Sequence, residues 1–319
     1  AAVESATENG TAALLARLLT EGGAQHDAME LVEAAELLGG SIGAEAGFEG
    51  ISVGSSLPVG RLAPMLDLMA EVAYQPTLPE REVERLRSLR LAQIEQAAAS
   101  PRARANEAII AAIYDDAPYG RPIGGRRESV AAITRASLTA RHEQLAQGAD
   151  PLFVIAGAFD PGDVFALVEA SALARGFVGA RGSRAPSTSS LLPDRPAAAA
   201  TGGGPRLLLV DRPGSVQSEL RIGRLGRSRL DAGFHAALVH SEIVGGLFGS
   251  RLNRVLREEK GYTYGAAAGF DFRRGRGPFV ARTAVETSVT AAALVERSEE
   301  HTSELQSHHD LVCRLLLEK

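Results

Sequence analysis

Residues 243–265, IVGGLFGSRLNRVLREEKGYTYG, are the stretch around which this chain is organised. They are predicted to join a glycine turn, a basic helix, a helix stop and a tyrosine-bearing strand. Helical spacing of the apolar residues predicts a helix over 250–260, which Gly261 ends because glycine takes the left-handed conformation without steric cost. The alternation in residues 262–264 predicts a strand with both tyrosines on one side of a sheet. Three glycines before the helix let the backbone approach another segment or a bound peptide closely: Gly245, Gly246 and Gly249.

The composition is that of an ordinary globular protein. A chain of 319 residues is long enough for two domains, since single cores stop growing near about 250 to 300 residues. A net charge of -5 gives no electrostatic reason to expect nucleic acid as a partner. No apolar run approaches the length of a membrane span, and no signal peptide is visible. We therefore expect a soluble protein, periplasmic or cytoplasmic, with no membrane span.

Apolar periodicity and proline or glycine boundaries predict the order of the elements. The first part should contain helices at 10–21 and 26–38, strands at 41–47 and 50–57, helices opening at Pro58, Pro79 and Pro101, helices near 128–133, 137–147 and 161–173, and a buried strand at 151–157. The second part should contain strands at 206–211, 217–225 and 279–285 and a helix at 232–244. This pattern predicts an α+β architecture with domains at 1–180 and 206–296, joined by a flexible linker at 181–205.

The pattern GGxFxSRLNxxLREExGYTYG in residues 245–265 resembles the signature of the C-terminal-type domain of the pitrilysin and insulinase zinc metallopeptidases, which include the mitochondrial processing peptidase. The resemblance covers residues 10–296. It implies two related α/β domains, with antiparallel-rich sheets and helices on one face, that form one half of a clam-shell truncated at both ends. In that family an arginine and a tyrosine polarise the scissile carbonyl, and their positions here are Arg257 and Tyr264. Without the resemblance, the stretch would be a helix with a solvated basic face followed by half-buried tyrosines.

The zinc motif of the active family members is missing. Their His-x-x-Glu-His pattern falls on Ala13, Ala16 and Arg17 of the helix at 10–21, and their further glutamate ligand falls on Gln93. None of these residues offers an imidazole, a thiolate or a carboxylate. We therefore expect no metal and no other cofactor on this chain.

Loss of the zinc ligands with retention of Arg257 and Tyr264 resembles the non-catalytic subunit of two-subunit family members. Such a subunit lends its arginine and tyrosine to a zinc-bearing partner of the same family. The substrate would be an extended peptide, held in part by the turn of Gly245, Gly246 and Gly249. The alternative is a degenerate peptidase-fold scaffold or binding protein, in which Arg257 is only a surface ion-pairing residue.

Residues 297–319 resemble a translated sequencing adapter, RSEEHTSELQSH and the residues that follow it. We predict a non-native tail that does not pack, with an amphipathic C-terminal helix as the alternative. The tail holds Cys313, the single cysteine, so disulfides within the chain are excluded.

Overall fold

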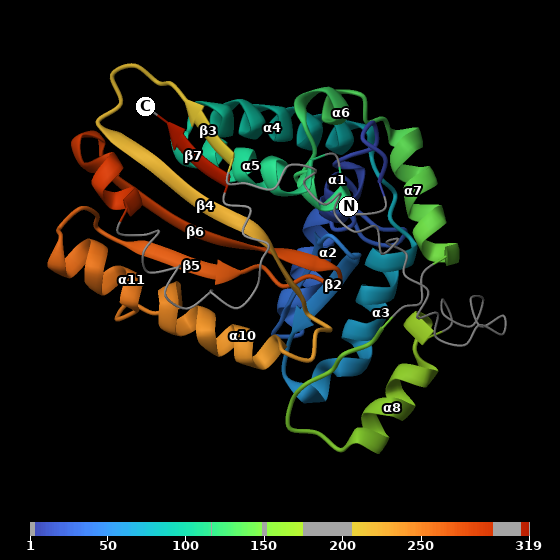
Figure 1. The fold of residues 1–319 in the computed structure, drawn as a ribbon. Helices are drawn as coiled ribbons and strands as arrows, with labels where there is room; N and C mark the ends of the chain where they lie inside the picture. Colours follow the sequence, from blue (N-terminus) through green and yellow to red (C-terminus); the bar gives the residue numbers. More distant parts are fainter. Residues whose placement is uncertain (1–3, 116, 149–151, 175–205, 296–313, 319) are drawn as a thin grey trace. The chain divides into compact units, whose positions relative to one another are not determined.

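The computed structural model describes residues 4–115, 117–148, 152–174, 206–295 and 314–318 (Figure 1). Its contacts divide the chain into two units, Ala1–Ile94 with Pro122–Leu191, and Glu95–Arg121 with Leu192–Lys319. The second unit thus includes a segment, 95–121, that the sequence groups with the first domain. The predicted linker at 181–205 lies outside the described residues. None of the helices in the described ranges has the length and apolar character needed to cross a bilayer.

The first unit consists of helices around one β-hairpin. Its elements are α1 Thr11–Leu18, α2 Ala28–Leu37, β1 Ser41–Ala46, β2 Ile51–Ser56, the short 3-10 helix η1 Val59–Arg61, α3 Leu62–Tyr74, the first part of α4 Glu80–Ala99, α6 Arg127–Ala131, α7 Arg135–Gly148 and α8 Pro161–Ala170. β1 pairs antiparallel with β2. Side-chain caps start two of the helices, since Asp27 accepts from the backbone of α2 and Asp160 from that of α8.

The core of the first unit lies between α1, the hairpin and the helices that follow. Leu15 and Leu18 of α1 are fully buried, as the leucine spacing predicts. Leu31 of α2, Met65 of α3 and Leu86 of α4 join the same cluster. Partly buried residues of β1 and β2 cover this cluster, which fixes α1 against the hairpin.

The strand predicted at 151–157 is wrong. Residues 152–157 form no ladder, and the side chains of Leu152 and Val154 are exposed. A strand needs a neighbour for its backbone hydrogen bonds. In the described part of this unit, the only sheet is the β1–β2 pair, which does not include this segment.

The second unit is built on a mixed five-stranded sheet. Its elements are α5 Pro101–Tyr114, the 3-10 helix η2 Pro118–Gly120, β3 Arg206–Val210, β4 Gln217–Ser228, α10 Phe234–Ser241, the π-turn η3 Glu242–Gly246, α11 Arg251–Asn253, the π-turn η4 Arg254–Glu259, β5 Ala266–Phe270, β6 Arg276–Glu286, the 3-10 helix η5 Thr287–Val289 and β7 Arg314–Glu318. The strand order is β3-β7-β4-β6-β5. β3 and β7 are parallel, and the other neighbours are antiparallel. Both units combine helices with antiparallel strands, which confirms the predicted α+β class.

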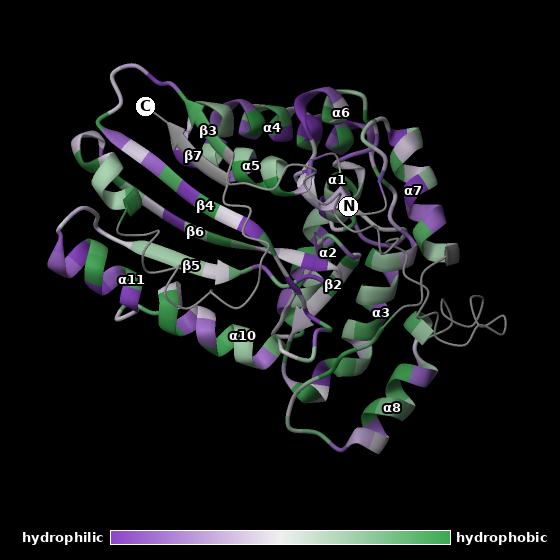
Figure 2. Ribbon diagram, viewed as in Figure 1, coloured by the Kyte–Doolittle hydropathy of each residue, from purple (hydrophilic) through white to green (hydrophobic). Residues whose placement is uncertain are grey.

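Alternate residues of β4 face opposite sides of this sheet, as the alternating hydropathy of the strand in Figure 2 illustrates. Leu220 packs in the cluster that holds Leu252 of α11 and Leu256 of η4. Arg221 bonds to Asn106 of α5, and Gly223 lies against the same helix. The helices of 234–259 therefore cover one face of the sheet, and α5 covers the other.

Part of the C-terminal tail belongs to the sheet. β7 lies between β3 and β4, with Leu316 opposite both Leu208 and Arg221. This pairing differs from the expectation that residues 297–319 do not pack, because the apolar run at 315–317 finds a strand partner on each side. The foreign origin of the tail stays a prediction.

Candidate functional site

The helical stretch predicted at 250–260 is present, but it is not a uniform α-helix. The single turn of α11 passes into the π-turn η4, and Gly261 ends the stretch with a φ of 65°. The backbone N–H of Tyr262 then donates to the carbonyl of Leu256 at 2.9 Å, which satisfies one of the terminal carbonyls. The predicted helix stop at Gly261 is therefore confirmed. The residues before it, Arg254–Glu259, form a short π-helix, which is wider than an α-helix and is frequent at functional sites.

Asn253 fastens this helical stretch to the sheet. Its Nδ2 donates to the carbonyl of Leu247 at 3.2 Å, and its Oδ1 accepts from the backbone N–H of Ala266 at 2.8 Å. The side chain is buried, so these bonds satisfy both ends of an amide that would be costly to bury alone. The sequence analysis did not predict this role, although Asn253 belongs to the motif SRLN.

Arg257 is held by two neighbours. Its Nη2 lies 2.7 Å from Oε1 of Glu258, and its guanidinium stacks over the ring of Phe248 at 3.6 Å from the ring centroid. The arginine side chain is mostly covered, whereas the Phe248 ring is 78% exposed. Cation–π stacking of this kind orients a guanidinium. Phe248 and Glu258 therefore both orient Arg257, and the sequence analysis predicted neither contact.

The strand predicted at 262–264 begins later, because β5 starts at Ala266. A local turn replaces the ladder: the backbone N–H of Gly265 donates to Oγ1 of Thr263 at 3.1 Å. Oγ1 of Thr283 lies 3.0 Å from both Oγ1 of Thr263 and the carbonyl oxygen of Gly265. Within this turn, Tyr264 is 95% exposed, whereas Tyr262 is partly buried.

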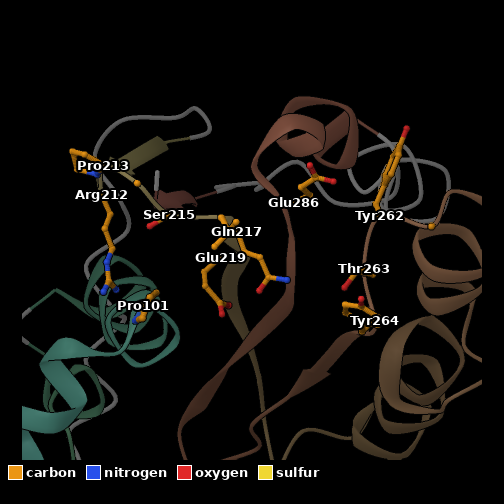
Figure 3. Close-up of a pocket in the computed structure, with 13 residues that line it drawn as sticks. Pro101, Arg212, Pro213, Ser215, Gln217, Glu219, Tyr262, Thr263, Tyr264 and Glu286 are labelled. Carbon is orange, nitrogen blue, oxygen red and sulfur yellow. The ribbon is translucent and has the colours of Figure 1, made fainter.

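An open pocket of about 860 Å³ lies beside this turn, within the second unit. Figure 3 shows Arg212 and Pro213 on one side of it and Tyr262 and Tyr264 on the other, with Glu219 between them. The lining residues are Pro101, Arg212, Pro213, Gly214, Ser215, Val216, Gln217, Glu219, Gly261, Tyr262, Thr263, Tyr264 and Glu286. The structure thus brings Tyr264 to the pocket, but Arg257 is not among the described residues that line it.

The three glycines of the turn have different surroundings. A side chain on Gly245 would overlap the backbone of Ala268 in β5, so this glycine permits a close approach of the helical stretch to the sheet. A side chain on Gly246 would overlap the carboxylate of Glu242, whereas Gly249 faces open space. At Gly245, the expected close approach is therefore to another segment of the chain, strand β5. Peptide binding by Gly245, Gly246 and Gly249 stays a prediction.

The residues that the resemblance assigns to the zinc positions lie on α1 and α4 of the first unit. Ala16 is buried, Ala13 is partly buried and Arg17 is exposed. Gln93 accepts a long contact, 3.5 Å, at Oε1 from Nη1 of Arg90. No group of three or more metal-ligating side chains occurs in the residues that the structure describes. The donor set at these positions does not fit zinc, which requires imidazole, thiolate or carboxylate ligands.

Glu71 and His26 form an acid–base pair elsewhere in the first unit. Glu71 is buried, and its Oε2 lies 2.7 Å from Nδ1 of His26. Oε1 of Glu71 accepts the backbone N–H groups of Gln25 and His26. Burial alone would raise the pKa of this carboxyl, but the hydrogen bonds from His26 and the backbone lower it below its usual value. His26 is thus engaged by a structural carboxylate.

Comparison with family models gives two matches that together cover most of the chain. Residues 1–127 match "Insulinase (Peptidase family M16)", and residues 132–309 match "Peptidase M16 inactive domain". The second match covers more than half of the chain and contains the helical stretch at 250–260 and the turn that carries Tyr264. Both matches agree with the resemblance drawn from residues 245–265.

Relatives and solved structures point to the same group. A protein of Mycobacterium leprae named as an uncharacterized zinc protease is 28% identical over 270 residues, 84% of this chain and 58% of that protein. One of Mycobacterium tuberculosis with a similar name is 29% identical over 303 residues, 92% of this chain and 63% of its own length. The chain thus spans less than two thirds of the length of these relatives.

The crystal structure of a peptidase M16 inactive domain from Pseudomonas fluorescens superposes with a TM-score of 0.78 at 27% identity, covering 96% of this chain and 72% of that one. The periplasmic protease PqqL from Escherichia coli superposes with a TM-score of 0.71 at 13% identity, over 94% of this chain and 32% of that one, and this likeness shows the fold alone.

Proposed function

Because this chain belongs to the M16 (insulinase) peptidase family, we propose that it is the non-catalytic subunit of a two-chain zinc metallopeptidase that cleaves extended peptides. In this proposal a partner of the same family carries the zinc, and this chain lends Arg257 and Tyr264 to the partner's site. The observation that carries the proposal is the contrast between α1 and α4, whose residues at the zinc positions cannot bind a metal, and Tyr264, whose side chain is free to contact a substrate.

The chemistry assigned to this chain is electrostatic. A guanidinium and a phenol that donate to the scissile carbonyl oxygen stabilise the negative charge that develops there, and each donor is typically worth about 3 to 4 kcal/mol. Tyr264 meets the requirement for access. Arg257 uses Nη2 for its contact with Glu258 at 2.7 Å, and the other N–H groups of the guanidinium would donate to the carbonyl.

The test is to mix this chain, extended to the full length of its relatives, with its zinc-bearing partner. We expect peptidase activity that neither chain shows alone. Arg257→Ala and Tyr264→Phe should each lower kcat about 100-fold with little change in KM, because both donors act on charge present only in the transition state. Arg257→Lys should restore little, since an ammonium lacks the planar fork of the guanidinium.

The matched control is Arg254→Ala, one turn away on the same helical stretch. Arg254 is exposed and contacts Glu259 at 3.5 Å, so its loss should leave kcat unchanged. A complex that keeps full activity with both Arg257 and Tyr264 replaced would sink the proposal. That result would favour the second candidate, a scaffold or binding protein, which the contact of Arg257 with Phe248 and Glu258 also supports.

A further inference from the structure

The helices of 234–259 carry apolar side chains on two faces. Val244, Leu252 and Leu256 pack into the core cluster of the second unit. The outer face carries a second apolar set, in which each side chain is more than half exposed: Val239, Ile243, Leu247 and Phe248. A helical segment that is apolar on both faces is expected to be covered on both, and exposed apolar surface of this kind marks a binding site.

Phe248 is the most exposed member of this outer set, and it stands on a firmly held backbone. The carbonyl of Leu247, the residue before it, accepts from Nδ2 of Asn253 at 3.2 Å and from the backbone N–H of Ser250 at 3.0 Å. The N–H of Leu247 donates to the carbonyl of Glu242 at 3.3 Å. A ring on a fixed backbone loses little conformational freedom when it binds a ligand, which favours a role in recognition.

The two faces of the Phe248 ring have different surroundings. Arg257 stacks on one face, with its Cζ 3.6 Å from the ring centroid. The side chain is nevertheless 78% exposed, so the other face is open. Gly249 comes next in the chain, and a side chain there would meet nothing within 4 Å. The ring can therefore hold Arg257 on one side and contact a ligand on the other.

We propose that Phe248, together with Leu247 and Ile243, is a subsite for a large apolar side chain of a bound peptide. Contact with such a side chain removes apolar surface of both molecules from water. The choice of a peptide rests on the proposed function, in which Arg257 donates to the scissile carbonyl. Because the Phe248 ring touches the same guanidinium, a side chain next to the scissile bond lies within its reach.

The chain contains no tryptophan, so Phe248→Trp places a single fluorescent reporter in the subsite. An indole also keeps an aromatic face for Arg257. The full chain with this substitution is titrated with three acetylated and amidated alanine-based peptides, which carry leucine, alanine or aspartate at one central position. We expect the leucine peptide to shift the emission to shorter wavelength and to bind about tenfold more tightly than the other two.

Leu247→Ser, added to Phe248→Trp, should remove most of this preference for leucine, because it takes away an apolar neighbour of the reporter. Leu230→Ser is the matched control, since Leu230 is an equally exposed leucine of the same unit in the turn after β4. A reporter at that turn, Leu230→Trp, should show no shift with any of the peptides.

The proposal is overturned if the three peptides bind equally, if none of them shifts the emission, or if Leu230→Ser weakens binding as much as Leu247→Ser does. A shift caused by the zinc-bearing partner without peptide would assign this surface to the partner and would also overturn it. Binding is measured on this chain alone, so a preference for leucine beside an inactive mixture would retain the subsite and remove the proposed function. An active mixture without that preference would do the reverse.

Discussion

Two arginines, Arg221 in the second unit and Arg90 in the first, have different partners. Arg221 contacts a carboxylate, whereas Arg90 contacts a carbonyl and an amide. Arg221 is 2% exposed, and Oε2 of Glu219 lies 2.9 Å from its Nη1. Oδ1 of Asn106 accepts from its Nε at 2.7 Å, and the carbonyl of Leu220 accepts from its Nη1 at 2.9 Å. Burial lowers the pKa of Arg221, and the carboxylate of Glu219 opposes that effect. Arg221 is therefore a paired, structural charge.

The hydrogen-bond partners of Arg90 in the described residues are a carbonyl and an amide, and its pKa is lowered by burial and by the charge of Arg17. A charge that is partly removed from water without a counter-charge raises the free energy of the folded state. The presence of a carboxylate partner, and not burial alone, therefore distinguishes Arg221 from Arg90.

The largest effect is expected for zinc binding, when metal ligands are introduced at the predicted zinc positions of α1 and α4. Replacing Ala13 and Arg17 with His, and Gln93 with Glu, restores three zinc ligands on α1 and α4. We expect the purified chain to hold no stoichiometric zinc and the triple variant to bind zinc near micromolar affinity, about 8 kcal/mol. Elemental analysis and a chelator competition measure this.

Adding Arg90→Gln to the triple variant should tighten zinc binding further, because it removes a cation next to the metal. One tightly held zinc on the unaltered chain would contradict the conclusion that the residues of α1 and α4 cannot bind the metal.

Glu219→Gln tests the paired arginine. The substitution leaves Arg221 buried without its carboxylate, and we expect a loss of about 3 kcal/mol in the free energy of unfolding. Urea denaturation followed in the second unit measures it. Glu286→Gln is the control, because Glu286 is an exposed carboxylate that lines the same pocket. Equal stability of the Glu219 variant and the Glu286 variant would show that Arg221 does not depend on its partner.

Glu71→Gln tests whether the loss of a paired carboxylate also destabilises the first unit. The carboxylate accepts from Gln25 and His26, and we expect the variant to lose about 2 kcal/mol near neutral pH. Because the pKa of Glu71 is lowered in the folded state, this stability is present above its usual value of 4.5 and is lost as the pH falls below it. The two proteins should therefore converge in stability in acid, and a constant difference down to low pH would contradict the pairing.

Arg90→Met should have the smallest effect and tests the contrast between the two arginines most directly. The substitution removes the bond to Gly124 but also an uncompensated charge, so we expect a change of within about 1 kcal/mol in either direction. Thermal unfolding in parallel with Arg221→Met, which also leaves Glu219 and Asn106 without their partner, measures the contrast. A loss at Arg90 as large as that at Arg221 would mean that Arg90 is a structural residue like Arg221.

The α+β class, the family and the helix that ends at Gly261 could be predicted from the amino-acid sequence alone. The absence of zinc ligands at Ala13, Ala16, Arg17 and Gln93 is a prediction from the same source. These features are local: helix periodicity, a glycine stop and a short motif depend on residues that are close together in the chain. The class and family are confirmed by the fold and by the family matches.

The positions of the side chains of the site could not be predicted without the three-dimensional fold. It stacked Arg257 on Phe248, began β5 at Ala266 rather than at Tyr262, and left residues 152–157 without a strand partner. It also brought Arg90 to Gly124, two residues 34 positions apart. Contacts of this kind depend on which elements become neighbours in space, and no periodicity within one element carries that information.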